Sequence, residues 1–283
     1  MKPPSFAYHR PDERADVDAL LARLADDAKI LAGGQSLVPI LNMRLAEPEH
    51  LLDINHMRDE PSQPEEFQNA LRFGPLVRQC VVEESGLVEE RVPLLAEAMK
   101  YVAHPAIRSR GTVTGSIAHA DPAAELPAVL VALEGEVVAR SQAGARTIPS
   151  HEFFVGPLEN SLQTGEWVAE TRWPTRLPDT GYAFEEFARR SGDYALCGVA
   201  AVVTRTNGHS FDAALAYLGM GDVPMRLETG AIESSDVDDA VASLTESLDP
   251  ISDLHAGRDF RMQLARRLGA RAVHRAVEAM DGN

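Results

Sequence analysis

The sequence predicts an α+β protein built from two parts, and three observations lead to that prediction. Strand and helix signals alternate over about the first 55 residues. Three strand-like segments joined by turn signals such as Asn207–Gly208 begin only after residue 176. Two helices with one apolar face then close the chain. A chain of 283 residues with 45% hydrophobic content is long enough to bury a core in each part.

The first part, residues 1–175, divides into lobes of about 1–55 and 56–175. A strand near 6–8 precedes a helix that Asp12 is placed to cap, and this helix carries an apolar face at i, i+3, i+4, i+7 spacing: Val17, Leu20, Leu21 and Leu24. The rest of this lobe is expected as a strand at 30–31, a glycine loop, a helix over 38–44 capped by Ser36, and a strand over 51–54.

The second lobe and the second part follow in order. For the lobe we expect a surface loop over 58–69, a strand at 71–73, helices near 76–84 and 92–101, a second glycine loop, a helix over 123–133, and strands at 137–139 and 168–173. Where the pattern changes, near 176, we place a domain boundary. The domain 176–283 is expected to hold strands over 181–190, 195–206 and 211–218 and helices over 236–248 and 258–279.

The composition excludes several classes of partner. The net charge is −16, whereas nucleic acids and anionic membranes require Lys and Arg to neutralise phosphate. No run of about eighteen apolar residues exists for a membrane span, and the first residues lack the apolar stretch of a signal peptide. We therefore expect a cytoplasmic protein that neither binds nucleic acid nor inserts into a membrane.

The metal-ligating residues are too dispersed to build a centre on this chain. Cys80 and Cys197 are far apart and belong to no CxxC pair, and the nine histidines show no HExxH spacing. We predict no metal here, so any iron–sulfur centre that works with this protein belongs to another chain.

The first glycine loop is a candidate anion site. It directly follows a strand and precedes a helix start, and it consists of Ala32, Gly33, Gly34, Gln35, Ser36 and Leu37. Glycine permits the positive φ angles that aim successive backbone N–H groups at one point, and a helix start favours phosphate. A plain strand-to-helix turn would have the same sequence. The loop is neither a Walker A loop nor a GxGxxG motif.

The second glycine loop runs from Gly111 to Ser116 and offers polar groups beside its glycines. Hydroxyl donors and a close-approach glycine are supplied by Thr112, Thr114, Gly115 and Ser116, and His119, Asp121 and Glu125 follow. We interpret Asp121 as the cap of the next helix, with Pro122 in its first turn, and Glu125 as the better acceptor for ribose hydroxyls. His119 fits a ligand or a structural role equally well.

A third segment, Arg189 to Ala195, contains Tyr194. This tyrosine could stack on a planar ring, or it could end a strand with its side chain in the core. The chain has no GxSxG elbow, no telling carboxylate pair and no catalytic cysteine signature. Nothing in the sequence is arranged to attack a substrate directly.

Three ordered segments together resemble one family. They are 31–37 with 42–45, then 108–122, then 188–198. The chain resembles the FAD-binding medium subunit of the molybdenum hydroxylases, of the aerobic carbon monoxide dehydrogenase and xanthine dehydrogenase type, over nearly its whole length.

The resemblance implies a fold, a cofactor and partners. The fold would be the two-lobed FAD-binding fold of the vanillyl-alcohol-oxidase (PCMH-like) flavoproteins, followed by a carbon monoxide dehydrogenase flavoprotein-like C-terminal domain with a small antiparallel sheet and helices. Both glycine loops would wrap the FAD pyrophosphate, with Tyr194 near the flavin ring. A small subunit would carry two [2Fe–2S] clusters and a large subunit the molybdenum cofactor, in a dimer of heterotrimers. Electrons would pass from the clusters through FAD to an external acceptor, and no acid or base on this chain need act.

Two departures from the family pattern leave alternatives open. Relatives usually carry Gly-Gly where this chain has Thr114-Gly115, and a β-branched Thr would be strained if residue 114 needed a positive φ. Distant relatives also carry a lysine where Glu185 and Glu186 stand here. The alternatives are a stand-alone FAD-dependent oxidoreductase, and an assembly subunit that has lost FAD.

Overall fold

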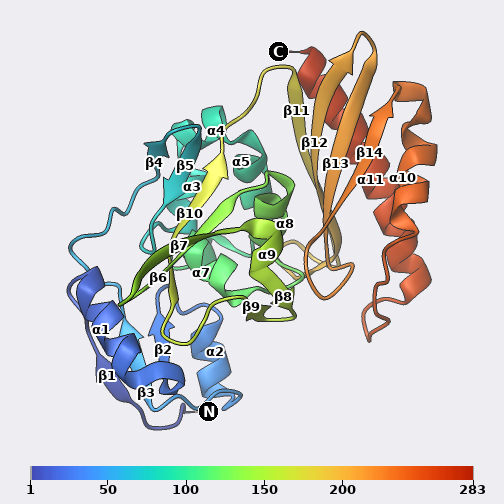
Figure 1. The fold of residues 1–283 in the computed structure, drawn as a ribbon. Helices are drawn as coiled ribbons and strands as arrows, with labels where there is room; N and C mark the ends of the chain where they lie inside the picture. Colours follow the sequence, from blue (N-terminus) through green and yellow to red (C-terminus); the bar gives the residue numbers. More distant parts are fainter. Residues whose placement is uncertain (1, 283) are drawn as a thin grey trace.

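The structure, a computed structural model, describes residues 2–282 and contains three principal sheets and one short hairpin (Figure 1). A three-stranded sheet and a five-stranded sheet form the first part, and a four-stranded sheet with two long helices forms the second. None of the described helices is both long enough and apolar enough to cross a membrane.

The first lobe is a parallel sheet of order β1-β3-β2. Its elements are β1 (Ala7–His9), α1 (Arg14–Leu24), the 3₁₀ turn η1 (Ala25–Asp27), β2 (Ala28–Leu31), α2 (Leu37–Asn42) and β3 (His50–Asp53). The apolar face of α1 is buried with Leu52 of β3 and Trp167 of the larger sheet. Helix α1 starts one residue later than Asp12 would place it. Glu13 is the N-cap, and the Asp16 carboxylate accepts the N–H groups of Asp12 and Glu13.

The second lobe is an antiparallel sheet of order β4-β5-β10-β6-β7. Its strands are β4 (Glu65–Phe67), β5 (Ala70–Phe73), β6 (Glu136–Ser141), β7 (Gly144–Pro149) and β10 (Trp167–Pro174), with the hairpin β8 (Phe154–Gly156) and β9 (Glu159–Asn160) beside them. Strand β4 lies inside the segment expected as a surface loop.

Helices cover this sheet in greater number than the sequence predicts. They are α3 (Gln79–Glu83), α4 (Gly86–Arg91), α5 (Pro93–Met99), α6 (Pro105–Arg108), α7 (Val113–His119), α8 (Glu125–Ala132) and α9 (Ser150–Phe153). Helix α4 separates the two expected ones because Ser85 caps its start with a bond from the Val88 N–H (3.3 Å), and Pro93 starts α5.

The prediction that Asp121 caps the helix after the second glycine loop is wrong. Helix α8 begins at Glu125 with Ala124 as its N-cap. The Asp121 carboxylate instead accepts the Ala123 N–H (2.9 Å) in the turn between α7 and α8. All eight residues of α8 are buried, because the helix lies between the five-stranded sheet and the C-terminal sheet (Figure 1).

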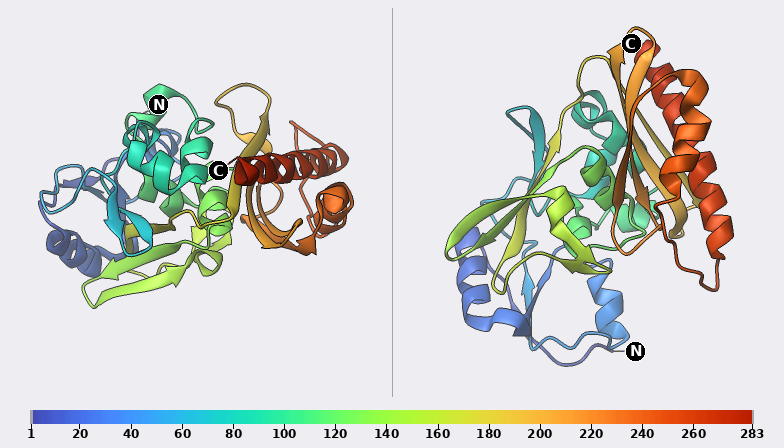
Figure 2. Two further views of the ribbon diagram at one scale, coloured as in Figure 1. Left: turned by 90° about the horizontal axis from the view of Figure 1, so that it is seen from above. Right: turned by 45° about the vertical axis from the view of Figure 1, so that its right-hand side comes forward.

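The C-terminal part is an antiparallel sheet of order β11-β12-β13-β14. Its elements are β11 (Thr180–Ala188), β12 (Ala195–Asn207), β13 (Ser210–Leu218), β14 (Met225–Ile232), the 3₁₀ turn η2 (Ser234–Asp236), α10 (Val237–Thr245) and α11 (Arg258–Asp281). Strand β14 is not expected from the sequence. Helices α10 and α11 cover one face of the sheet, and the first part of the chain covers the other (Figure 2).

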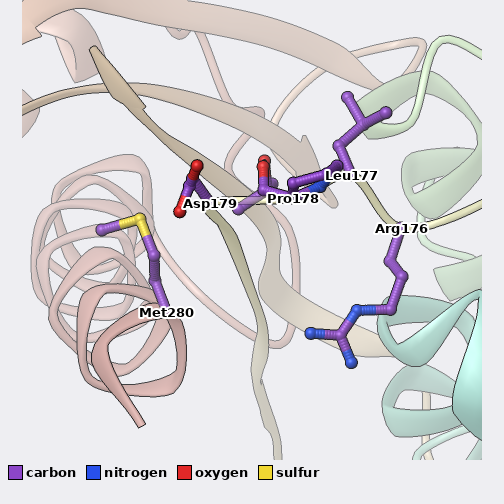
Figure 3. A pocket seen from close by; sticks show the side chains of 6 residues that line it. Arg176, Leu177, Pro178, Asp179 and Met280 are labelled. Atoms are coloured by element: carbon purple, nitrogen blue, oxygen red, sulfur yellow. The ribbon is translucent and has the colours of Figure 1, made fainter. Parts of the chain in front are cut away.

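The two parts are joined by the segment between β10 and β11. Residues 176–179 of this segment line a cavity of about 380 Å³ together with Thr180 of β11 and Met280 of α11. Figure 3 shows Asp179 beside the Met280 side chain, with Arg176 and Leu177 on the other side. The cavity is formed by the linker and includes neither glycine loop.

Candidate functional site

The two glycine loops, about 80 residues apart in sequence, lie in direct contact. A Cβ atom placed on Gly33 would come within 2.5 Å of the Arg110 carbonyl oxygen and 2.7 Å of the Gly111 Cα. Real Cβ atoms do not approach so closely, so residue 33 has to be glycine for the loops to meet. The fold therefore brings two segments that are far apart along the chain into one candidate site.

The first loop presents free backbone donors. Within residues 2–282, none of the backbone N–H groups of Gly33, Gly34, Gln35 and Ser36 donates to a protein acceptor. Gly34 has φ +73°, which turns the chain as an anion-binding concavity requires. The Gln35 side chain folds back and donates to the Gly33 carbonyl (3.0 Å), so it stiffens the loop. Ser36 precedes α2 and makes no capping bond, and Ala32 and Leu37 flank the turn at the ends of β2 and α2.

The second loop is mostly helix, and its amides are largely occupied. The expected loop residues Thr114, Gly115 and Ser116 lie in α7, with Thr112 as its N-cap. The Thr112 hydroxyl accepts the Gly115 N–H (3.1 Å) and its carbonyl accepts the Ser116 N–H (3.1 Å). The N–H groups of Gly111 and Val113 donate to Ile107 and Val77. The first loop is therefore the richer source of anion donors.

The strain that a positive φ would impose on Thr114 is absent. Thr114 is buried inside α7 and is not among the residues with positive φ. A helical backbone accepts a β-branched residue at a small cost. The loss of the second glycine therefore leaves the backbone of this segment unstrained.

Asn55 and Arg78, which sequence analysis did not single out, connect the two loops. The Asn55 side-chain amide donates to the Ala32 carbonyl (2.8 Å), and its oxygen accepts a bond from Arg78. Arg78 also donates to the Arg110 carbonyl. The only local signal was the position of Asn55 directly after a strand, at the edge where the first loop also begins.

Two carboxyl groups from different parts of the chain lie near the start of α8. Burial raises the pKa of Glu125 to about 7, and Asp121 raises it further than Arg108 lowers it. Burial, followed by the nearby Glu125 charge, raises the pKa of Glu186 to about 8. The Glu186 Oε2 atom is buried with no hydrogen-bond partner among residues 2–282. Because its pKa is about 7, the Glu125 carboxyl is present in both protonation states near neutral pH.

Tyr194 lies at the surface between β11 and β12, with 70% of its area exposed, and not in the core. Partial burial of its hydroxyl and the nearby Asp121 and Glu125 raise the pKa of Tyr194. It lines a cavity of about 580 Å³ with Pro122 and Pro157 of the first part and Arg189 and Arg261 of the second. An exposed aromatic ring beside such a cavity is free to stack on a planar ligand.

Neither His119 nor Cys197 lies in a glycine loop. His119 is the last residue of α7, on the segment that leads to the carboxyls. Cys197 is buried, and burial raises the pKa of its thiol to about 12, so it is a structural residue. Among the described residues, no group of three or more His, Cys, Asp or Glu side chains is arranged to hold a metal ion.

Comparison with known proteins decides the family. The model described as "FAD binding domain in molybdopterin dehydrogenase" matches residues 4–176. The chain belongs to the FAD-binding medium subunits of the molybdenum hydroxylases. A second model, "CO dehydrogenase flavoprotein C-terminal domain", matches residues 182–276 of this medium subunit.

Full-length relatives agree with this assignment. The medium subunit is 40% identical to the 6-hydroxypseudooxynicotine dehydrogenase complex subunit alpha of Paenarthrobacter nicotinovorans, covering 99% of this chain and 100% of that one. It is 39% identical to the caffeine dehydrogenase subunit beta of a Pseudomonas species, covering 98% of this chain and 97% of the relative. The medium subunit is thus part of an oxidoreductase, as predicted.

Solved structures confirm the predicted fold. Carbon monoxide dehydrogenase from Hydrogenophaga pseudoflava superposes with a TM-score of 0.92 at 34% identity, covering 99% of both chains. Quinoline 2-oxidoreductase from Pseudomonas putida 86 superposes with a TM-score of 0.90 at 33% identity, covering 99% of this chain and 100% of that one. The medium subunit therefore has an FAD-binding domain followed by a C-terminal domain with a small antiparallel sheet.

Proposed function

We propose that this medium subunit holds FAD between its two glycine loops and relays electrons from [2Fe–2S] clusters on a small partner subunit to an external acceptor. A large partner subunit would carry the molybdenum cofactor and oxidise the substrate, in a dimer of heterotrimers. The observation that carries the proposal is the first loop, whose four consecutive N–H groups from Gly33 to Ser36 have no protein acceptor within residues 2–282. This loop lies against the second loop at Gly33.

The residues present fit the chemical parts of FAD. The N–H groups of Gly33 to Ser36 would bind the pyrophosphate as a set of preorganised donors. The Ser116 hydroxyl and the α7 start would approach it from the other side. Glu125 would accept hydrogen bonds from ribose hydroxyls, and the exposed ring of Tyr194 would cover part of the flavin.

The role that we assign to each subunit follows from the chemical groups present on this chain. Bound FAD supplies a carrier that can take electrons one at a time and release them in pairs. This chain would bind and orient that carrier and exclude water around it through the contact of its two domains. Substrate selection would belong to the large subunit.

The test is whether the native assembly carries flavin through these loops. The purified assembly should show flavin absorbance and release FAD on denaturation. Stoichiometric protein without flavin would disprove the proposal.

Replacing both Gly33 and Gly34 by Val should abolish FAD binding, because the first side chain would collide with residues 110–111 and the second would occupy a positive φ. Substrate should still reduce the iron–sulfur clusters of the variant, measured by their visible spectrum. Unchanged flavin content would refute the assignment of the pyrophosphate site. As a control, Gly86→Ala changes a glycine with open space around it and should keep its FAD.

A further inference from the structure

Two arginines, Arg78 and Arg110, lie where Gly33 of the first glycine loop meets residues 110–111, a place that we call the seam. Within residues 2–282 neither Arg78 nor Arg110 forms a salt bridge, whereas other arginines of the same part, such as Arg14 and Arg108, are paired. Burial, followed by the neighbouring Arg110 charge, lowers the pKa of Arg78, and its guanidinium nevertheless stays ionised at any working pH. The two guanidinium charges lie close enough to act on each other, and no salt bridge within residues 2–282 neutralises either of them.

The carboxylate whose charge acts on Arg78 already has hydrogen-bond partners of its own. Asp53 accepts bonds from the Tyr8 hydroxyl (2.6 Å) and from the backbone and side-chain nitrogens of Asn55 (3.0 and 2.6 Å). Cys80 and, to a smaller extent, Asp53 raise the pKa of Arg78, but burial and the Arg110 charge lower it by more. The local field at the seam therefore remains positive and suits an anion.

The guanidinium also fixes the shape of the seam. Arg78 donates to the Arg110 carbonyl directly before the second loop and to Asn55, whose side-chain amide in turn donates to the Ala32 carbonyl on the first loop. The Gln79 N–H donates to the Gly111 carbonyl (2.9 Å), so the backbone beside Arg78 is tied to the same loop. Arg78 is therefore bonded to Arg110 beside the second loop and, through Asn55, to Ala32 of the first loop.

We propose that Arg78, through Asn55 and together with Arg110, positions the two glycine loops and supplies the positive charge that makes this site select a diphosphate-bearing dinucleotide. The inference rests on the proposed FAD function and extends it to residues outside both loops. Arg78 is a positioning residue whose charge acts on the ligand through space, while the first-loop N–H groups make the direct contacts.

The test measures FAD and ADP binding to the purified assembly after its flavin has been removed, over a series of salt concentrations. Arg78→Met should weaken FAD about tenfold or more and flatten the salt dependence of the affinity, because a charge and its hydrogen bonds are lost. ADP should lose a similar factor, since it carries the same diphosphate. Asn55→Ala should weaken FAD by a smaller factor and keep the wild-type salt dependence, because the charge remains. Arg78→Lys should keep the salt dependence and fall between wild type and Arg78→Met.

The control is a variant of an arginine that is remote from both glycine loops. Arg205→Met removes a guanidinium from β12, far along the C-terminal sheet, and should change neither quantity. Wild-type affinity or wild-type salt dependence in Arg78→Met would overturn the inference. If Arg78→Met fails to fold by circular dichroism, wild-type FAD affinity in both Arg78→Lys and Asn55→Ala would overturn it. A wild-type assembly that takes up no FAD would instead overturn the proposed function.

Discussion

At the scale of single residues, strand alternation gives two neighbouring glutamates opposite environments. Glu185 points to α11, where it bonds to Arg271 and Arg275. Glu186 points to the FAD-binding domain, where its Oε2 atom is buried without a partner among residues 2–282 and its pKa is raised to about 8. One step along β11 therefore separates a structural ion pair from a carboxyl that titrates near physiological pH.

The raised pKa of Glu186 predicts a stability change with pH. An acid whose pKa is higher in the folded state than its ordinary 4.5 contributes stability at low pH and loses it as pH rises to about 8. Glu186→Gln should therefore leave the melting temperature nearly unchanged at pH 5 and raise it at pH 8, by on the order of 1–2 kcal/mol in unfolding free energy once partial exposure is allowed for.

Thermal unfolding of the flavin-free protein at several pH values measures this effect. The adjacent Glu185→Gln is the matched control and should destabilise at pH 8, because it breaks the bonds to Arg271 and Arg275. Equal pH profiles for Glu186→Gln and wild type would contradict the prediction.

At the candidate site, sequence motifs identify some of the residues but not others. Glycine chemistry and the position after a strand made Gly33 and Gly34 candidates, and the resemblance of three ordered motifs to one family then assigned them a role. Arg78 and Asn55 could not be selected, because their role depends on two carbonyls, Ala32 and Arg110, that are far apart in the chain. Whether Thr114 is strained could not be decided from the sequence, because its backbone conformation, helical in α7, cannot be read from the residue type.

At the scale of elements, α11 is the longest helix of the described chain and is fixed by close approach to the sheet. Gly269 of α11 lies against the Tyr217 hydroxyl of β13, and that hydroxyl donates to the Ala265 carbonyl (3.2 Å). The helix can therefore approach β13 only where it lacks a side chain. Periodicity located this helix from the sequence, whereas its distance from the sheet depends on close contacts such as this one and that of Gly181 of β11 with Ala276.

Gly269→Ala should destabilise the protein by about 1–3 kcal/mol, although Ala is the better helix former, because the new methyl group would overlap Tyr217. Adding Tyr217→Phe should recover part of that loss, because it removes the atom in conflict. Chemical denaturation of the two single variants and the double variant measures the coupling. Strictly additive effects would show that this contact does not set the helix position.

The elements that the sequence missed were short or ambiguous. Strand β14 has no fully buried residue, and its apolar–polar alternation over 225–228 breaks off at Thr229 and Gly230, so it lacks the pattern of a strand at the core. Helix α7 was expected as a loop because Thr, Gly and Ser are typical of turns, yet buried neighbours on α8 and β10 hold it helical. The long strands β12 and β13 were predicted almost residue for residue, since their apolar runs are bounded by clear turn signals.

At the scale of the whole molecule, one hydrophobic cluster contains residues of both domains. Phe184 of β11 is fully buried and packs against Tyr101 of the first domain, with ring centroids 5.2 Å apart. Arg275 of α11 bonds to Glu97 of α5 as well as to Glu185, so an ion pair crosses the same interface. The buried helix α8 contacts β12, β13 and β14. An interface of this kind couples the folding of its two sides.

Calorimetry of the wild-type chain should accordingly record a single unfolding transition. Phe184→Ala should lower the stability by about 3–5 kcal/mol and separate the transition into two, because the cavity opens between the domains. Phe211→Ala, which removes a ring from the core beneath α10 and α11, should destabilise without separating the domains. Two transitions in the wild type would contradict the idea of a shared core.

By itself the sequence determined the α+β class, the order of most elements, the absence of a nucleic-acid-binding charge pattern, and the three motifs that identify an FAD-binding medium subunit. These features depend on neighbours within a few positions, where periodicity and turn chemistry operate. Only the tertiary structure decided that the glycine loops touch, that Arg78 and Asn55 join them, and that Glu186 faces Glu125 across the domain interface. Those relations join residues tens of positions apart, and packing of complete elements, not local preference, sets which of them meet.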